Sequence, residues 1–508
     1  MIKSLDKSEP NRPRRKPKWP IDGDNQQPLF TKRPPLRKMT VLIDAELLKP
    51  LKVRSGKTIK QNPEIVLAAL LDHEYVQFYK YSENGPPSTE KPLEFEGHFK
   101  PPYPVYEGWA VIHEFDNGHW PVTIGHSPES YAVSGVSSNA PQVARNHATT
   151  AAEDVFAPEQ REKDVLALHV ASEAVQADIY ITERPYLYAD GKLASTPGVT
   201  VCTVKEAMTI LGLYLRTQGE FVIPTGSKSF KFSFNRGLYF WVGTRELLPE
   251  AWRWFSACVQ HSTKIGDDKL LLLGGSLLDR VARALQSRDD IHTALNLPTN
   301  NDNTDDALGS LDNVLVLLMG SVDVSARVAH YVLGLSPRQE YGAAWQKAAW
   351  LRQIRATAPN LALIVDPNTS GEHILTILRL LRNSVHGAAL QGITVLENNK
   401  QEMLIGLPAN DEADILMAMD AMGGRDSWGF RPLLPGRSHV DPAMLADRLF
   451  EEVVKLLNSL MKETPVESLA QVRVTAASKL PPKDKPDKGN FNTFSEWNRQ
   501  AIRLQLGL

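Results

Sequence analysis

The chain has 508 residues, of which 42% are hydrophobic and 23% are charged, and its formal net charge is -2. This length allows several domains with buried cores, and this composition is typical of soluble globular proteins. The small net charge argues against a protein that wraps nucleic acid over its whole surface, although it leaves local basic patches open. The only cysteines, Cys202 and Cys258, form no Cys-x-x-Cys pair, which excludes a zinc ribbon or a disulfide scaffold and favours a reducing compartment.

Residues 1–38 are basic and rich in proline, as in the run from Arg12 to Lys18, and they show no hydrophobic period. This composition predicts a disordered arm. Such an arm either neutralises the phosphates of RNA or DNA or is a solvated tail. The N-terminus has no apolar core of a signal peptide, and the longest apolar runs are too short to span a bilayer, so we expect a cytoplasmic protein without a membrane partner.

The segment 39–218 has strand patterns that alternate with helix patterns. The predicted strands are 39–43, 75–81, 109–115, 177–182 and 198–202, and the predicted helices are 62–70, 160–176 and 204–216. A proline-rich loop follows the second strand, and another loop is expected around 134–139. This alternation predicts an α/β/α domain whose sheet is mostly parallel, with helices on both faces.

The second half of the chain is expected to be mainly helical. Its predicted parts are a connector with helices at 219–298, a polar linker at 299–307, an all-α domain at 308–465 and a flexible tail with a short helix at 466–508. The connector opens with an aromatic hairpin or extended segment at 221–244. The linker is predicted because its asparagine and aspartate residues cannot bury apolar surface. The predicted helices of the all-α domain are 311–333, 342–357, 373–387 and 443–462, with a strand-like interruption at 393–396 and 403–405.

Three acids of the first domain are predicted to meet at one edge of its sheet. Asp44 ends the first strand, Asp164 is placed at the opening of a helix, and Glu183 follows another strand. Ligands of open α/β sheets bind at the carboxyl ends of strands, and several carboxylates there suit Mg²⁺ and phosphodiester hydrolysis. Any one of these acids alone is more simply a helix cap or a solvated strand end. Asp178 is expected to cap or turn the chain.

The order of elements over 164–207 resembles the closing half of a PIN-domain nuclease, and the strand before Asp44 resembles that family's opening strand. The resemblance implies a metal-dependent ribonuclease fold over about 39–218, with Asp44, Asp164 and Glu183 as Mg²⁺ ligands. The sequence departs from the family at Glu183, where an aspartate is usual, and the inserted segment 109–138 lengthens the middle of the domain.

The family's second helical acid has two candidates here, Glu64 and Glu153. A run of histidines and acids also lies in the inserted segment: His113, Glu114, Asp116, His119 and His126. These residues suggest a metal cluster, but the run from Glu114 to Gly118 also fits a strand end and a turn. We favour the turn, because no helix aligns these side chains.

The helix predicted to end at Gly387 carries Arg379, Arg382 and His386 at i, i+3 and i+7, which places them on one face. Two permanent cations beside an imidazole suit a group that binds a phosphate and moves a proton. The simpler interpretation is a helix end whose last-turn cations complement the macrodipole, with Gly387 as the cap.

This helix is similar to the signature helix of HEPN domains, which are all-α modules. The resemblance implies metal-independent RNA cleavage, in which His386 is the general acid or base and Arg379 or Arg382 stabilises the phosphorane charge. It also allows a homodimer in which two such helices complete one site. The spacing departs from the family: three residues separate Arg382 from His386, where four to six are usual, whereas six separate Arg379 from His386.

No Walker loop or G-x-G-x-x-G element is present. Our first hypothesis is therefore an RNA-directed nuclease-like protein of bacterial defence against phage or of toxin type, with RNA as the expected partner and DNA as the second candidate. The alternative is a non-catalytic nucleic-acid-binding or interaction protein on degraded nuclease folds. A weaker third hypothesis is a small-molecule hydrolase that uses the histidine-rich loop. Acids that gather around a metal position favour the first, and an ion pair that fills that position favours the second.

Overall fold

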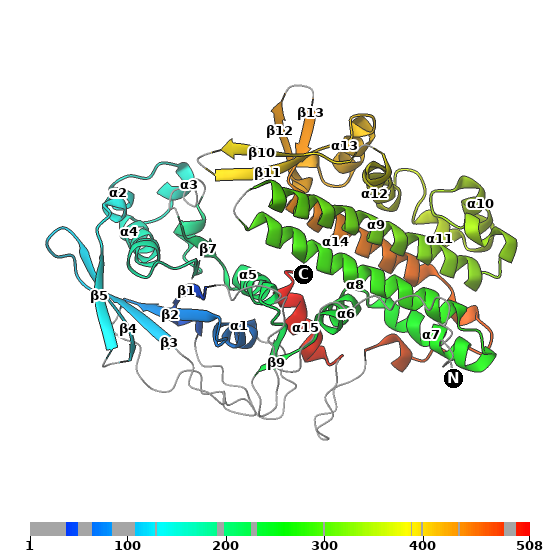
Figure 1. Cartoon of the computed structure of the whole chain (residues 1–508), viewed down its shortest axis with the longest axis horizontal. Helices are drawn as coiled ribbons and strands as arrows, with labels where there is room; N and C mark the ends of the chain where they lie inside the picture. The colour runs from blue at the N-terminus through cyan, green and yellow to red at the C-terminus, as the bar shows by residue number, and fades with distance from the viewer. Residues whose placement is uncertain are drawn as a thin grey trace, which may run out of the picture.

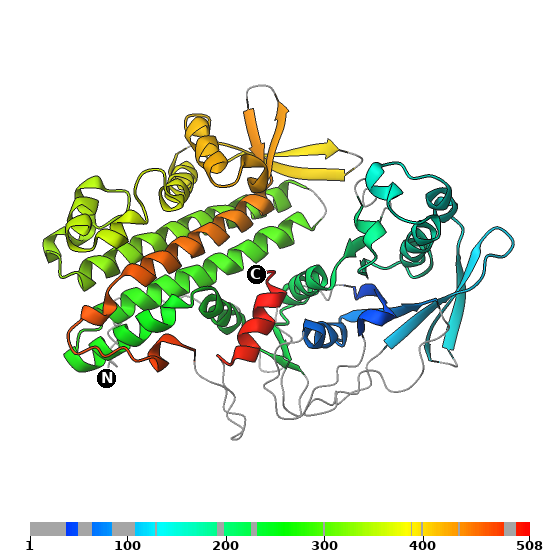
Figure 2. The ribbon, with the colours of Figure 1, turned by 180° about the vertical axis from the view of Figure 1, so that it is seen from behind.

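A computed structural model describes residues 37–48, 63–83, 107–127, 130–189, 198–224, 231–297, 300–387, 389–397, 400–434, 437–481 and 494–508. Within these ranges the chain forms an N-terminal α/β domain beside a larger, mainly helical part, as two opposite views show (Figure 1, Figure 2). The predicted fold class is confirmed at this level: a mostly parallel sheet comes first and a helical half follows. Of the predicted arm 1–38, all but Arg37 and Lys38 lie outside the described residues.

The N-terminal domain is built on a seven-stranded sheet with the order β5-β4-β3-β2-β1-β6-β7. Its strands are β1 (Met39–Asp44), β2 (Val76–Ser82), β3 (Glu107–Ile112), β4 (Trp120–Ser127), β5 (Ser130–Val136), β6 (Ile179–Ile181) and β7 (Thr200–Cys202). The central strand β1 pairs in parallel with both β2 and β6, and β3 and β7 extend the parallel part on either side. The chain leaves β1 toward β2 and returns at β6, so the boundary between β1 and β6 is a topological switch point.

Alternate residues of β1 face opposite layers of helices. Val41 and Ile43 are buried in a core shared with α1 (Pro63–Leu71) and α5 (Val204–Thr217). Leu42 is buried in the opposite core, which includes residues of α4 (Pro158–His169). Because successive side chains of a strand point to opposite faces, a continuous apolar run is what a sheet covered on both faces requires.

The inserted segment differs from its prediction. Instead of one strand followed by a loop at 134–139, β4 and β5 add an antiparallel extension to the sheet. Asn117 and Gly118 have φ values of 48° and 88° between the bridged residues Asp116 and His119, so the predicted turn is confirmed. In the ranges that the structure describes, no group of three histidines, cysteines or acids is placed to hold a metal ion.

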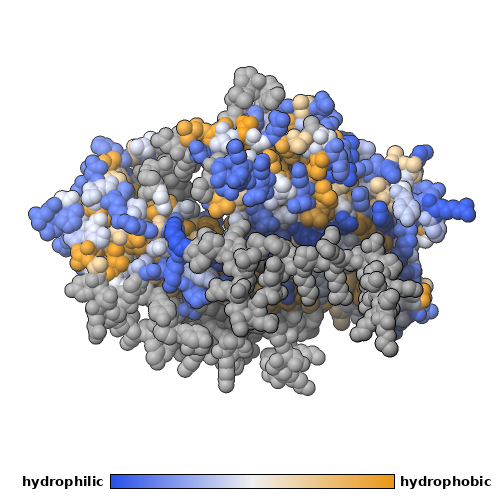
Figure 3. All heavy atoms as spheres, in the orientation of Figure 1, coloured by the Kyte–Doolittle hydropathy of each residue, from blue (hydrophilic) through white to orange (hydrophobic). Residues whose placement is uncertain are grey.

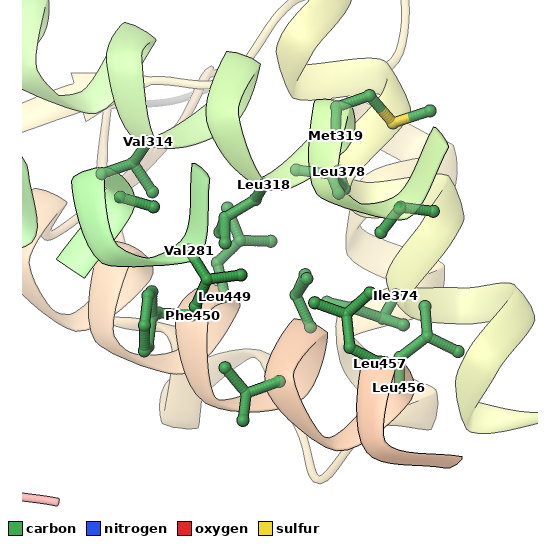
Figure 4. Packing of buried hydrophobic residues seen from close by; sticks show 14 of the residues in the cluster. Val281, Val314, Leu318, Met319, Ile374, Leu378, Leu449, Phe450, Leu456 and Leu457 are labelled. Atoms are coloured by element: carbon green, nitrogen blue, oxygen red, sulfur yellow. The ribbon is translucent and has the colours of Figure 1, made fainter. Parts of the chain in front are cut away.

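The helical part has one continuous core. Its helices are α6 (Arg236–Leu247), α7 (Glu250–Ile265), α8 (Lys269–Leu295), α9 (Asn301–Val332), α10 (Ala348–Thr357), α11 (Pro359–Leu363), α12 (Ser370–His386), α13 (Glu412–Ala421) and α14 (Pro442–Glu463). Side chains of α8, α9, α12 and α14 interlock in this core, as Val281, Leu318, Leu378 and Leu449 illustrate (Figure 4). One side of α12 is buried in this core along most of the helix. Apolar residues therefore recur along α12 at helical spacing.

The polar run at 299–307 is not a linker, because residues from Asn301 onward form the first turns of α9. The side-chain oxygen of Asn300 accepts a hydrogen bond from the backbone nitrogen of Asn303, 2.8 Å away, and caps the helix. An asparagine cap and an acid such as Asp302 in the first turn both stabilise a helix N-terminus. Ala307 is already fully buried, so the core begins within this polar run.

The strand-like interruption predicted in the helical half is confirmed and is part of a larger antiparallel sheet. β10 (Gly392–Glu397), β11 (Lys400–Gly406), β12 (Phe430–Leu434) and β13 (Arg437–Val440) pair in the order β10-β11-β13-β12. The second half is therefore not all-α. The aromatic segment predicted at 221–244 is a hairpin only at its start, in β8 (Val222–Pro224) and β9 (Lys231–Ser233), because α6 follows from Arg236.

The predicted tail ends in a docked helix, α15 (Glu496–Gln505), which lies between the α/β domain and the helical part (Figure 1, Figure 2). Its residues Ala501 and Ile502 are fully buried. In the described part of the chain, α9 alone has the length and hydropathy of a membrane span, but 50% of its most apolar stretch is buried within the protein. Burial of that extent is the pattern of a core helix.

Candidate functional site

The carboxyl edge of the sheet is organised around Arg184, which lies three residues after Ile181, the last residue of β6. Its guanidinium nitrogens contact three carboxylates: Nε lies 3.2 Å from Oδ2 of Asp44, Nη1 3.1 Å from Oδ1 of Asp164, and Nη2 3.0 Å from Oε1 of Glu83. The guanidinium carbon also lies 5.5 Å from the centre of the Tyr81 ring. One cation thus joins the ends of β1, β2 and β6 to helix α4.

Asp44 accepts two further hydrogen bonds from β6 and its end. Oδ1 lies 2.8 Å from the hydroxyl of Tyr180, and Oδ2 lies 2.6 Å from the hydroxyl of Thr182. With the Arg184 contact, both oxygens of this nearly buried carboxylate are occupied. Burial, followed by the charge of Asp44, raises the pKa of Tyr180, so this phenol stays protonated and donates.

Asp164 is fully buried and lies in the middle of α4, not at its opening as predicted. Oδ1 accepts from the side chain of Gln160, 2.7 Å away, and from Arg184. Oδ2 has no hydrogen-bond partner among the described residues. Burial raises the pKa of Asp164, although the Gln160 hydrogen bond and the Arg184 charge oppose that rise.

Glu183, the third predicted ligand, does not join this group. It is exposed, and its Oε1 accepts from the backbone nitrogen of Val204, 3.2 Å away, at the start of α5. Of the candidate fourth acids, Glu153 is buried in the capping box of α3 (Ala151–Asp154), and the side chain of Glu64 lies outside the described residues. Asp178 fastens the start of β1, because Oδ2 accepts from the backbone nitrogen of Thr40, 2.8 Å away.

These residues do not fit the Mg²⁺ site that the sequence suggested. A divalent cation needs oxygen ligands that converge on one point. Here Oδ2 of Asp44 and Oδ1 of Asp164 both accept from the guanidinium of Arg184, and Glu183 accepts from the start of α5. The arrangement places the guanidinium of Arg184 between the acids, so an ion-pair network occupies the switch point.

The three residues of the predicted Arg/His site share α12 but do not form a bonded cluster. Arg379 and His386 are exposed, and among the described residues neither side chain has a hydrogen bond or an ion pair. The helix ends at His386, and the backbone nitrogen of Gly387 donates to the carbonyl of Asn383, which confirms the predicted helix end and cap.

Arg382 is half-buried and belongs to a different group, around Asp323 of α9. Burial raises the pKa of Asp323, and the opposing positive charges come from four elements. These cations are Arg327 of α9, Arg382 of α12, Arg280 of α8 and Lys347 before α10. Four cations thus act electrostatically on one half-buried carboxylate.

Sequence reasoning missed Arg184 and Glu83. A usable signal was present, since Glu83 directly follows β2 and Arg184 lies three residues after the end of β6, at the edge where the predicted acids were also placed. Carboxylates at a sheet edge suggest a metal ion, but an arginine near the same edge can supply the balancing positive charge. Comparison with family models, curated proteins and solved structures gives no match for this chain.

Proposed function

We propose that this protein binds RNA without cleaving it, on a PIN-like α/β domain joined to a HEPN-like helical part that have both departed from a catalytic arrangement. The observation that carries the proposal is the guanidinium of Arg184 between Asp44 and Asp164. Metal-dependent hydrolysis would require that position to hold a cation that can exchange ligands and activate water. A guanidinium does neither, because it has no open coordination position and stays protonated.

Support for a PIN-like domain comes from the order of β1, α4, β6, β7 and α5, which follows the order expected from the resemblance. Two features stand apart from the family patterns: the β4–β5 extension of the sheet and the small sheet within the helical part. A role in bacterial defence or in a toxin system rests on the same resemblance and is part of the proposal.

Support for RNA as the partner comes from the distribution of charge. The formal net charge of the chain is -2, yet Arg280, Arg327, Arg382 and Lys347 gather around Asp323. Grouped arginine and lysine side chains recruit phosphates, because each contact releases condensed counterions from the nucleic acid. Arg379 on α12 adds one more such cation on a neighbouring turn.

The test incubates fluorescently labelled single-stranded RNA with wild-type protein, Asp164→Ala and His386→Ala, each with Mg²⁺ and with EDTA. We expect fluorescence polarisation to report salt-sensitive binding, and gels to show intact RNA in every lane. EDTA-sensitive cleavage that is lost in Asp164→Ala would overturn the proposal in favour of the sheet edge. EDTA-resistant cleavage lost in His386→Ala would overturn it in favour of α12. Absence of binding at low salt would contradict RNA as the partner.

A further inference from the structure

A groove runs along the exposed side of α8. Its first section, with a volume of about 510 Å³, lies between α6 and α8, and its second section, of about 550 Å³, lies between α7, α8 and α9. Asp279 and Arg283 line both sections, so the two adjoin along these residues of α8. We call this surface the α8 groove.

The floor of the α8 groove is one face of a single helix. Leu272, Ser276, Asp279, Arg283 and Gln286 recur at intervals of three or four residues, which places them along one side of α8. From the first to the last of these residues the helix rises about 21 Å. A floor of this length suits an extended chain better than a compact small molecule.

The charges on this floor are not used by the fold. Asp279 and Arg283 are both exposed, and among the described residues neither side chain makes a hydrogen bond or an ion pair. Many arginines elsewhere in the described chain are paired, as Arg288 is with Asp447. Arg283 is therefore available to a ligand.

The cations continue beyond the groove toward α12. The guanidinium of Arg280 lies on Gly320 of α9, where an added Cβ would come within 2.4 Å of Nη1. Gly320 precedes Asp323 by one turn, so Arg280 connects the groove with the four-cation cluster around that carboxylate. The path from Arg283 through Arg280 to Arg327 and Arg382 thus carries four cations. Two carboxylates, Asp279 and Asp323, lie along it.

Each section of the groove has an aromatic wall, and the same buried cation supports both. Trp241 lines the first section and Phe255 the second. The guanidinium carbon of Arg245, a residue only 4% exposed, lies 5.1 Å from the Trp241 ring centre and 4.7 Å from that of Phe255. Cation–π contact with a fixed guanidinium orients both rings. Where the helical part is visible in Figure 3, hydrophilic and hydrophobic residues are intermixed on its surface.

We infer that the α8 groove is the track for a single-stranded nucleic acid, whose phosphates contact Arg283 and Arg280 and whose bases pack against Trp241 and Phe255. This inference rests on the proposed RNA-binding function and adds its surface and its strandedness. Alternating cations and aromatic rings along a groove are the features that bind single strands without sequence preference. Duplex RNA offers no unstacked bases to such walls.

The test uses fluorescein-labelled oligouridylate and oligothymidylate of twelve nucleotides and the full-length protein, with affinity measured by anisotropy over a range of NaCl concentrations. Arg283→Gln should weaken binding several-fold and reduce the slope of log K against log salt by about 0.7, the value for one lost phosphate contact with a single strand. Asp279→Asn should tighten binding, because it removes a negative charge from the track. Both substitutions are at exposed positions without partners, so folding should be retained and is checked by circular dichroism.

The matched control is Arg145→Gln, which removes an exposed arginine of the α/β domain far along the chain from the groove. It should leave affinity and salt slope unchanged. If the wild type binds but neither groove variant alters the affinity, the groove is excluded while the proposed function stands. If the wild type binds neither oligonucleotide, the proposed function fails as well. If a duplex of equal length binds as tightly and with the same dependence on Arg283, the role of the aromatic walls is overturned.

Discussion

Nη1 of Arg184 lies 3.1 Å from Oδ1 of Asp164, whose other carboxylate oxygen is buried without a described hydrogen-bond partner. This contact ties the end of β6 to the middle of α4 across the edge of the sheet. Since the same guanidinium also holds Asp44 and Glu83, its loss would leave several carboxylates close together without a counterion. The stability of the α/β domain should therefore depend on one arginine.

Replacing Arg184 with alanine should lower the free energy of unfolding by about 3 kcal/mol, because a buried charge loses its partner. Urea denaturation at neutral pH measures this change. Arg145→Ala is the matched control, since the side chains of Arg145 and Glu162 are 46% and 21% exposed and a surface pair of this kind should contribute far less to stability. Equal losses in the two variants would contradict a central role for Arg184.

Removal of the guanidinium should also change the response to divalent cations. In Arg184→Ala the oxygens of Asp44 and Asp164 are freed, and oxygen ligands of this type bind Mg²⁺. We expect MgCl₂ to raise the melting temperature of the variant more than that of the wild type, at matched ionic strength in NaCl. An identical response of both proteins would show that these carboxylates do not converge closely enough for a metal.

The raised pKa of Asp164 predicts a pH dependence of stability. A folded-state pKa above the unfolded value means that the folded state binds the proton more tightly, so stability falls as pH rises from the unfolded value, about 3.9, through the folded one. Asp164→Asn lacks this titration. The stability of the variant relative to wild type should thus increase with pH across that window, as urea midpoints at successive pH values would report. The opposite slope would mean that Arg184 outweighs burial and lowers the pKa.

The cap of α9 offers a test of the continuous helical core. Asn300→Ala should cost about 1 kcal/mol of stability, because the first turn loses its side-chain acceptor. Asn300→Gly should cost only a few tenths of that amount, since glycine is itself a tolerated cap. If residues 299–307 were a solvated linker instead, neither substitution would shift the unfolding transition.

The docking of α15 depends on a close approach at Gly212 of α5. A Cβ added there would lie 2.9 Å from Cβ of Gln505 and 3.0 Å from its carbonyl oxygen. Gly212→Ala should therefore destabilise the protein by about 1–3 kcal/mol through overpacking. The control is Gly309→Ala in α9, where no atom lies within 4 Å and alanine should stabilise the helix by up to about 1 kcal/mol. Thermal unfolding of both variants measures the contrast, and a neutral Gly212→Ala would show that α15 is not held closely.

Elements with strong local signals could be predicted from the sequence. The apolar run before Asp44 predicted a strand, and the structure has β1 there. The proline at position 63 predicted the start of a helix, and α1 begins at that residue. The antiparallel strands β4 and β5 were missed, because their residues alternate with turn formers. The order of β4 comes from pairing with β3, and that of β5 from pairing with β4. The polar start of α9 was misread for a related reason: asparagines and aspartates are equally typical of linkers and of capped helix ends.

The sequence by itself determined that strands and helices alternate in the first half, that the second half is mainly helical, and that Asp44 ends a buried strand. Only the tertiary structure decided what Asp44 and Asp164 contact, since 120 positions separate them and no local pattern encodes which cation lies between them. The strand order brings Arg184 to that position, because β6 pairs directly beside β1 and ends level with it. Electrostatic neutralisation depends on distances in space, and those distances exist only once the sheet has formed.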